Sequence, residues 1–159
     1  MTRAAVITVS DRSAAGARED ASGPIAVAAV RDAGFDCADA VVVPDGADSV
    51  ERALTAEIVA GVKLIVTTGG TGVAPRDQTP EGTARVLTRE IPGIAEELRR
   101  LGAAEKPAAM LTRGLAGVVD PHGVLVVNLP GSTAAVASGM PVVLSVARHV
   151  LDQLGGGDH

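Results

Sequence analysis

The stretch Thr67-Thr68-Gly69-Gly70-Thr71-Gly72 lies between the apolar run Leu64-Ile65-Val66 and the charged run Arg76-Asp77-Gln78-Thr79-Pro80-Glu81. An apolar run of this kind is typical of a buried strand, so the glycines follow the strand's carboxyl end. Glycines permit positive φ angles and close backbone approach, so successive N–H groups can converge on an anion. The stretch therefore predicts a phosphate-binding loop, and the alternative is a tight turn that binds nothing. Thr79 and Pro80 are expected at the N-cap and first position of the next helix.

Outside this loop the chain alternates short apolar runs with amphipathic segments. Strands are expected over 4–9, 41–43, 63–67 and 123–128, and helices over about 24–33, 48–60, 80–88, 94–101, 133–138 and 141–154. Asp48 and Glu51 resemble a capping box at the start of the second helix. Such alternation predicts an α/β domain, in which helices cover both faces of a sheet of parallel strands.

Four polar or glycine-rich segments follow the expected strands: residues 10–16, 44–46, 68–79 and 128–132. In open parallel sheets, ligands bind outside the carboxyl ends of the strands, so we expect these segments to form one site. No repeat or shift of composition divides the chain. We therefore expect a single domain over residues 1–154, followed by a flexible glycine-rich tail over residues 155–159.

The composition argues against several partners. The formal net charge is −5, the only lysines are Lys63 and Lys106, and Phe35 is the only residue among Phe, Tyr and Trp. Nucleic-acid binding uses clustered cations and stacking aromatic rings, so no nucleic-acid partner is expected. No apolar stretch approaches the roughly 20 residues that span a bilayer, and the N-terminal apolar segment is too short for a signal peptide. The single Cys37 permits no intrachain disulfide, so we expect a cytoplasmic protein with no membrane partner.

Two common phosphate-binding motifs do not fit residues 69–72, the glycine loop. No lysine lies in or just after it, as a Walker loop requires, and Pro75 stands where a dinucleotide fingerprint needs its third glycine. What remains is a glycine cradle with two carboxylates, Asp45 and Asp77, in loops expected at the same edge of the sheet. Mg²⁺ prefers one or two carboxylates together with phosphate oxygens and water, which suits phosphoryl or nucleotidyl transfer. Arg76 either clamps a phosphate or forms an ion pair with its neighbour Asp77.

Several motifs occur along the chain in one order. They are Thr8-Val9-Ser10-Asp11, Asp20-Ala21-Ser22-Gly23-Pro24, Pro44-Asp45, Thr67-Thr68-Gly69-Gly70-Thr71-Gly72 with Arg76-Asp77-Gln78-Thr79-Pro80, and Asn128-Leu129-Pro130-Gly131. Together they resemble the molybdenum-cofactor biosynthesis domain, and within it the molybdopterin adenylyltransferases and the G domain of gephyrin. The resemblance covers nearly the whole chain.

The resemblance implies a three-layer α/β/α, Rossmann-like fold and a homotrimer. It also implies adenylylation of molybdopterin by Mg-ATP, with release of pyrophosphate and hand-over of the product to a molybdate-insertion enzyme. Asp45 and Asp77 match the family's two important aspartates, which are expected to bind Mg²⁺ with ATP. Other contacts to ATP and molybdopterin are then expected from Ser10, Asp11, Thr68, Gly69, Gly70, Thr71, Gly72, Arg76, Thr112, Asn128, Pro130, Gly131 and Ser132. Thr112 stands where many members have serine, and residues 118–122 form an irregular insert.

Alternative readings remain at this point. Asp45 also fits a plain turn after Pro44, and Asp77 also fits a residue that offsets a helix dipole. The whole chain fits a non-catalytic molybdopterin-binding paralogue or scaffold, although a pure binder has no need for two metal-binding aspartates. Molybdate insertion and nicotinamide or nucleotide-sugar chemistry are more distant alternatives.

Overall fold

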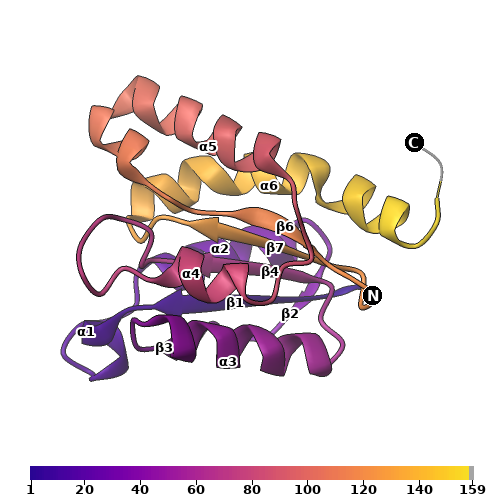
Figure 1. The fold of residues 1–159 in the computed structure, drawn as a ribbon, viewed down its shortest axis with the longest axis horizontal. Helices are drawn as coiled ribbons and strands as arrows, with labels where there is room; N and C mark the ends of the chain where they lie inside the picture. Colours follow the sequence, from indigo (N-terminus) through magenta and orange to yellow (C-terminus); the bar gives the residue numbers. More distant parts are fainter. Residues whose placement is uncertain (158–159) are drawn as a thin grey trace.

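The computed structural model describes residues 1–157 as a seven-stranded sheet flanked by helices (Figure 1). The strands are β1 (Arg3–Val9), β2 (Asp36–Cys37), β3 (Val41–Val43), β4 (Leu64–Thr68), β5 (Arg89–Glu90), β6 (Ala116–Val119) and β7 (Val124–Leu129). The helices are α1 (Asp11–Ala14), α2 (Ser22–Asp32), α3 (Ala47–Val59), α4 (Thr79–Ala84), α5 (Pro92–Glu105), the 3₁₀ helix η1 (Pro107–Leu111) and α6 (Thr133–Leu154). Of the tail expected over 155–159, the last two residues lie outside the described part of the chain, and its flexibility stays a prediction.

The centre of the sheet is parallel, as expected. The strand order is β2-β1-β4-β7-β6-β5, with β3 also paired to β1. Thr8 of β1 lies opposite Thr68 of β4, which in turn lies opposite Leu129 of β7. This register brings the carboxyl ends of β1, β4 and β7 to one edge of the sheet. The segments that follow these strands therefore start side by side.

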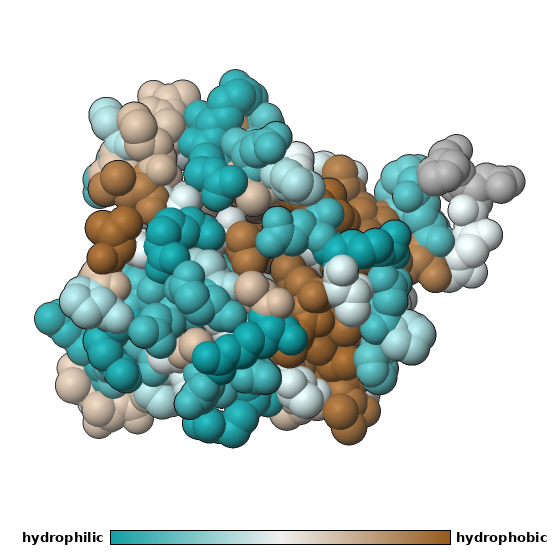
Figure 2. All heavy atoms as spheres, viewed as in Figure 1, coloured by the Kyte–Doolittle hydropathy of each residue, from teal (hydrophilic) through white to brown (hydrophobic). Residues whose placement is uncertain are grey.

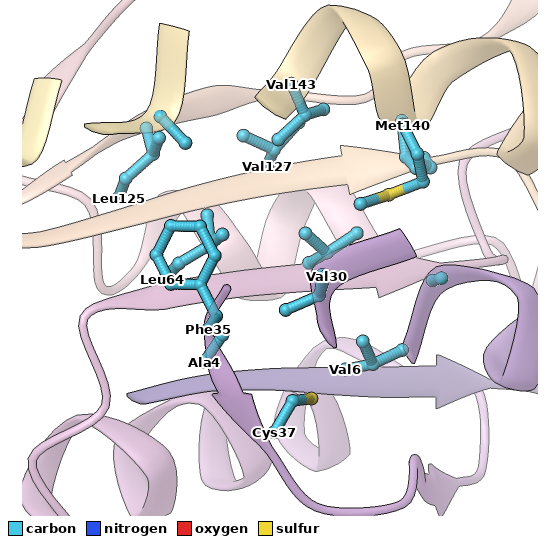
Figure 3. Close-up of a cluster of buried hydrophobic side chains, with 14 of the residues drawn as sticks. Ala4, Val6, Val30, Phe35, Cys37, Leu64, Leu125, Val127, Met140 and Val143 are labelled. Atoms are coloured by element: carbon cyan, nitrogen blue, oxygen red, sulfur yellow. The ribbon is translucent and has the colours of Figure 1, made fainter. Parts of the chain in front are cut away.

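Side chains of the central strands alternate between two apolar layers. In β1, Val6 belongs to a cluster with residues of α2 and α6, whereas Ile7 belongs to a cluster with residues of α3. Figure 3 shows the first cluster, in which Leu64, Val127 and Met140 point into the space between the sheet and its helices. Because strand residues alternate in direction, near-continuous apolar runs are what a sheet covered on both faces requires. The α/β/α prediction is confirmed, with α5 and α6 on one side and α3 on the other in Figure 1.

The second half of the sheet differs from the expectation. The helix expected over 80–88 ends at Ala84, and the chain then forms the short strand β5, which pairs antiparallel with β6. β6 in turn pairs antiparallel with β7, so the first part of the apparent insert 118–122 is the end of a strand. Gly117 allows this pairing because a Cβ there would lie 2.4 Å from the carbonyl oxygen of Arg89. Strands this short carry too few residues to show a period.

The last helix also differs. Two helices were expected around Pro141, but α6 runs unbroken from Thr133 to Leu154 with that proline inside it. Among the described residues it is the one helix whose 22 residues and mean hydropathy of 1.5 meet the length and composition of a membrane span, so the expectation that no stretch comes near this length was wrong. Val136, Met140 and Val143 are buried in the cluster of Figure 3. Packing on the sheet accounts for the apolar character of this face.

The expected capping box at the start of α3 was wrong as well. Gly46 is the N-cap, and no side chain caps the helix. Asp48 and Glu51 instead both accept hydrogen bonds from the Arg85 guanidinium, which lies just after α4. An arginine more than 30 residues away in the sequence competes for these carboxylates, and sequence spacing alone cannot reveal it.

Candidate functional site

A pocket of about 820 Å³ opens at the carboxyl ends of β1, β4 and β7. One wall is the loop between α1 and α2, another is η1, and the floor is formed by the glycine loop and the first turn of α6. Of the residues expected in the site, those that line this pocket are Ser10, Asp45, Thr68, Gly69, Gly70, Thr71, Gly72, Asp77, Thr112, Pro130, Gly131 and Ser132. Asp11, Arg76 and Asn128 do not line it. The fold thus gathers most of the expected residues into one concave surface.

The glycine loop requires glycine at its first two positions. Gly69 and Gly70 have φ angles of +93° and +69°, which residues with a side chain rarely adopt. A Cβ at Gly69 would lie 2.3 Å from the carbonyl oxygen of Val9, and the Gly69 N–H donates to Leu129 O at 3.0 Å. The loop therefore crosses tightly between the ends of β1 and β7, and only bare backbone fits there.

Thr79 holds the far side of this loop. The helix starts at Thr79 itself, with Gln78 as its N-cap, so the expected N-cap position was wrong by one residue. The Thr79 hydroxyl is fully buried and donates to Gly69 O at 2.9 Å, while its N–H donates to Gly70 O at 3.0 Å. The side chain that was expected to cap a helix instead holds Gly69, and the main chain of the same residue holds Gly70.

Asp45 and Asp77 both lie beside the glycine loop. A Cβ at Gly70 would come within 3.1 Å of Asp45 Oδ1, and a Cβ at Gly72 within 2.8 Å of Asp77 Oδ2. Both carboxylates line the pocket. The two acidic side chains, which are 32 positions apart in the sequence, thus lie beside the same short backbone segment.

Electrostatics at Asp45 disfavour its charged form. Burial raises the pKa of the Asp45 carboxyl, and the charges of Asp11 and Asp77 raise it further, against the lowering effect of a hydrogen bond from the Asp11 N–H. A partly buried carboxylate near two others is stabilised by any cation that binds between them. Among the described residues no group of three or more His, Cys, Asp or Glu side chains forms a protein-only metal site.

Arg76 does not form the expected ion pair with its neighbour Asp77, and its contact to phosphate stays a prediction. Its guanidinium donates to both carboxylate oxygens of Asp11 at 3.1 Å and to the Asp45 carbonyl oxygen at 2.9 Å. The bond from Arg76 lowers the pKa of Asp11, whose Oδ1 accepts the Asp45 N–H at 3.0 Å. Asp11 and Arg76 therefore join three loops at the edge of the pocket, and this arrangement holds Asp45 in place.

Asn128 lies in the interior below the glycine loop. Its Oδ1 accepts from Leu115 N–H at 3.0 Å, and its Nδ2 donates to the hydroxyls of Thr67 and Thr83 at 2.9 and 3.0 Å. The residue is 3% exposed, and both amide hydrogens and the amide oxygen already have partners within the protein. Asn128 therefore joins β7 to β4 and α4 beneath the site.

Hydroxyl groups border the other walls. Thr112 Oγ1 donates to Thr71 Oγ1 at 2.9 Å, so the residue that replaces the usual serine still bonds to the glycine loop. Ser132 is the N-cap of α6 and accepts from Ala135 N–H, and Ser10 caps α1 in the same way. Thr68 Oγ1 is buried and bonds to Ser22 Oγ at 3.1 Å.

Two of the residues in or near the pocket that were not expected there make several contacts to it or to the glycine loop. Asp20 lines it and accepts hydrogen bonds from the Thr8 hydroxyl at 2.8 Å and from Gly23 N–H at 3.0 Å. Its place in the motif at residues 20–24 was the available signal. Arg113 contacts the glycine loop from behind, and nothing in its spacing along the chain indicates this.

The mouth of the pocket is partly apolar. Figure 2 shows hydrophobic atoms interrupting the hydrophilic surface at the left edge of this face, where the loop after β4 lies in Figure 1. Val73 of that loop and Leu111 of η1 are more than half exposed, and both line the pocket.

A glycine-rich backbone cradle at the carboxyl edge of a mostly parallel sheet is typical of α/β proteins that bind phosphorylated ligands. Residues 5–149 match a family model described as "probable molybdopterin binding domain". The chain therefore belongs to the molybdenum-cofactor biosynthesis domain family, and the resemblance seen in its motifs is confirmed.

Relatives and solved structures agree with this assignment. The chain is 41% identical to a molybdenum cofactor biosynthesis bifunctional protein of Synechococcus elongatus, over 98% of this chain and 48% of that protein. It is 38% identical to a molybdopterin adenylyltransferase of Pyrococcus furiosus, over 92% of this chain and 87% of that protein. The crystal structure of a molybdopterin biosynthesis protein from Mycobacterium abscessus matches with a TM-score of 0.90 and 42% identity, over 98% of this chain and 97% of that one. The chain spans about half the length of the bifunctional relatives.

Proposed function

We propose that this chain acts in molybdenum-cofactor biosynthesis as a molybdopterin adenylyltransferase. In this reaction the terminal phosphate of molybdopterin attacks the α-phosphorus of ATP, and pyrophosphate leaves. The observation that carries the proposal is the position of Asp45 and Asp77 beside the glycine loop, both lining the pocket. The names of relatives such as the Pyrococcus furiosus adenylyltransferase support it.

The residues present suit Mg²⁺ bound together with a nucleotide. Asp45 and Asp77 would each supply a carboxylate oxygen, and phosphate oxygens and water would complete the coordination. Bound Mg²⁺ neutralises charge on the bridging and departing phosphate oxygens. N–H groups of the glycine loop and of the first turn of α6, where Thr133 and Ala134 line the pocket, favour phosphate on the same side.

The pocket has room for more than a nucleotide's phosphates. Its volume of about 820 Å³ lies in the upper range of small-molecule sites, which run from roughly 300 to 1,000 Å³. The wall formed by η1 presents Ala108, Ala109 and Leu111 to the cavity. With no aromatic side chain on this wall, the flat pterin ring would rest on apolar and backbone atoms, and its phosphate would point toward the glycine loop.

Pyrophosphate release tests the proposal. Wild-type protein incubated with Mg-ATP and molybdopterin should release pyrophosphate, and Asp77→Asn should lower the rate by roughly a hundredfold or more, as loss of an electrostatic group at a reacting phosphate does. Asp120→Asn is the matched control, because Asp120 is an exposed aspartate that pairs with Arg89 away from the pocket. Wild-type protein that binds molybdopterin tightly without turnover would instead support the non-catalytic alternative. Unchanged turnover in folded Asp77→Asn would refute the role of that carboxylate.

A further inference from the structure

Arg113 makes a dense set of contacts behind the glycine loop. Its Nε donates to Gly72 O at 2.8 Å, and its Nη2 donates to Asp77 O at 2.7 Å. Its main-chain N–H donates to Thr71 O at 2.8 Å. The Glu81 carboxylate accepts from Nη1 at 2.7 Å and from Nη2 at 3.2 Å. One residue thus bonds to the glycine loop, to the backbone of Asp77 and to the first turn of α4.

Apart from Arg113, the segment that it holds is anchored to other loops by the Arg76 guanidinium, which donates to Asp11 and to the Asp45 carbonyl oxygen. Between Gly72 and Asp77 the turn is closed by Asp77 N–H to Ala74 O at 3.0 Å and by Ala74 N–H to Asp77 Oδ2 at 3.1 Å, both within the turn itself. Residues 73–76 are exposed, whereas Gly72 and Asp77 are half-buried. The position of the Asp77 carboxylate relative to the body of the protein therefore depends on contacts from outside the turn, and Arg113 supplies two bonds that span it, at Gly72 and at Asp77.

Arg113 is itself well anchored. The neighbouring Thr112 carbonyl accepts from Arg99 Nη1 at 3.4 Å, and the Gly114 carbonyl accepts from the same nitrogen at 3.1 Å. Arg99 belongs to α5, which packs on the sheet through Ile94 and Ala95. The Arg113 clamp is therefore connected to a helix of the core.

The ion pair with Glu81 is poorly suited to a role in stability alone. The side chains of Arg113 and Glu81 are 38% and 47% exposed, and exposed ion pairs contribute little to folding. A bidentate arginine–carboxylate pair does fix the orientation of the guanidinium plane. All three guanidinium nitrogens are occupied by protein acceptors, and Arg113 does not line the pocket.

We propose that Arg113 is a positioning residue for the Mg-nucleotide site. It fixes the glycine loop and the backbone of Asp77, so that the Asp77 carboxylate meets the metal at the right place. This inference rests on the proposed function, because it assumes that Asp77 binds Mg²⁺ held by a nucleotide. Arg113 acts through Asp77 and touches no phosphate.

The test is the Mg²⁺ dependence of ATP binding, measured by titration calorimetry on wild type, Arg113→Ala, Arg113→Lys and Arg89→Ala. Arg89→Ala is the matched control, because Arg89 makes a similar exposed bidentate pair with Asp120 at the far edge of the sheet. We expect Arg113→Ala to raise the Mg²⁺ concentration for half-maximal ATP binding at least tenfold and Arg113→Lys to raise it by an intermediate factor. Arg89→Ala should match wild type. ATP affinity without Mg²⁺ should be the same in all four proteins.

A double-mutant cycle separates positioning from other roles. If Arg113 acts through Asp77, then Arg113→Ala should have no further effect on the Mg²⁺ midpoint once Asp77→Asn is present. An additive loss in the double variant, or a loss of Mg²⁺-free ATP affinity in Arg113→Ala, would show that Arg113 does not act through Asp77 alone and would overturn the inference.

Thermal unfolding of each variant identifies a misfolded protein, and if Arg113→Ala does not fold, Arg113→Lys decides by the same criterion. A folded Arg113 variant with a midpoint within twofold of wild type overturns the role of Arg113 alone. Wild-type protein that binds no Mg-ATP at all overturns the proposed function.

Discussion

Replacing Gly69 with alanine tests the geometry on which the site depends. Two costs follow from the structure. At φ of +93° an L-residue is strained by about 1–2 kcal/mol. In addition, the new Cβ would lie 2.3 Å from the Val9 carbonyl oxygen, and relieving that overlap requires a backbone shift, for which overpacking costs of about 1–3 kcal/mol are typical. Gly69→Ala should therefore lower the free energy of unfolding by about 2–5 kcal/mol.

Gly61 offers a matched control. It has a φ of +89°, and the nearest atom to a Cβ there is Arg3 Nη1 at 3.8 Å, an ordinary contact. Gly61→Ala should thus show the conformational cost alone, about 1–2 kcal/mol. Urea denaturation of both variants separates the cost of the positive φ angle from the cost of the Cβ overlap. Mg-ATP binding is measured on the same variants. Gly69→Ala should also lose nucleotide binding, whereas Gly61→Ala should retain it. If the two variants were equally destabilised, the close crossing of the glycine loop over β1 would be disproved.

Three further predictions concern residues around the pocket. Asn128→Ala should lower the free energy of unfolding by about 3–5 kcal/mol in urea denaturation, because it removes the shared partner of Thr67, Thr83 and the Leu115 N–H; a loss below 1 kcal/mol would mean that these groups find other partners. Asp45→Asn should raise stability at pH 7 and weaken Mg-ATP binding. Burial raises the pKa of Asp45, so the wild-type protein loses stability as the pH rises from about 4 through that raised pKa. In thermal melts the extra stability of Asp45→Asn should vanish below about pH 4, and extra stability that persisted there would contradict this cause. Asp11→Asn should lower stability at pH 7, because bonds from Arg76 hold the pKa of Asp11 below its usual value and stabilise the fold above about pH 4. In thermal melts the loss of stability relative to wild type should shrink as the pH falls through the lowered pKa, and a loss that did not depend on pH would point to packing instead.

Much of the fold was predictable from local pattern. The apolar runs at 4–9, 64–66 and 124–127 appear as β1, β4 and β7, since a strand buried on both faces needs no polar alternation. The β5–β6 pairing was not predictable, because a two-residue strand has no period and its partner residues lie 27 and 29 positions away in the sequence. The unbroken α6 was also missed, because the packing of Val136, Met140 and Val143 outweighs the local effect of Pro141.

The sequence indicated which residues lie at the candidate site better than it indicated which contacts they make. Asp45, Asp77 and the glycine loop were chosen as residue types that suit Mg²⁺ and phosphate, and the structure places them together. The partner of Arg76 was not predictable, because its nearest carboxylate in sequence, Asp77, is not the one it bonds; Asp11, 65 residues away, is. Such pairs depend on which side chains come within hydrogen-bond distance of one another where neighbouring strands end.

By itself, the sequence determined the order of elements, the double-sided core and the family, because periodicity and turn residues are local properties of the chain. The tertiary structure alone decided that Arg76 bonds to Asp11, that Arg113 holds the backbone of Gly72 and Asp77, and that Asn128 is occupied beneath the site. These contacts join residues between 36 and 65 positions apart in the sequence. Their distances follow from the register of β1, β4 and β7 and from how the helices pack on them, and no local pattern encodes either.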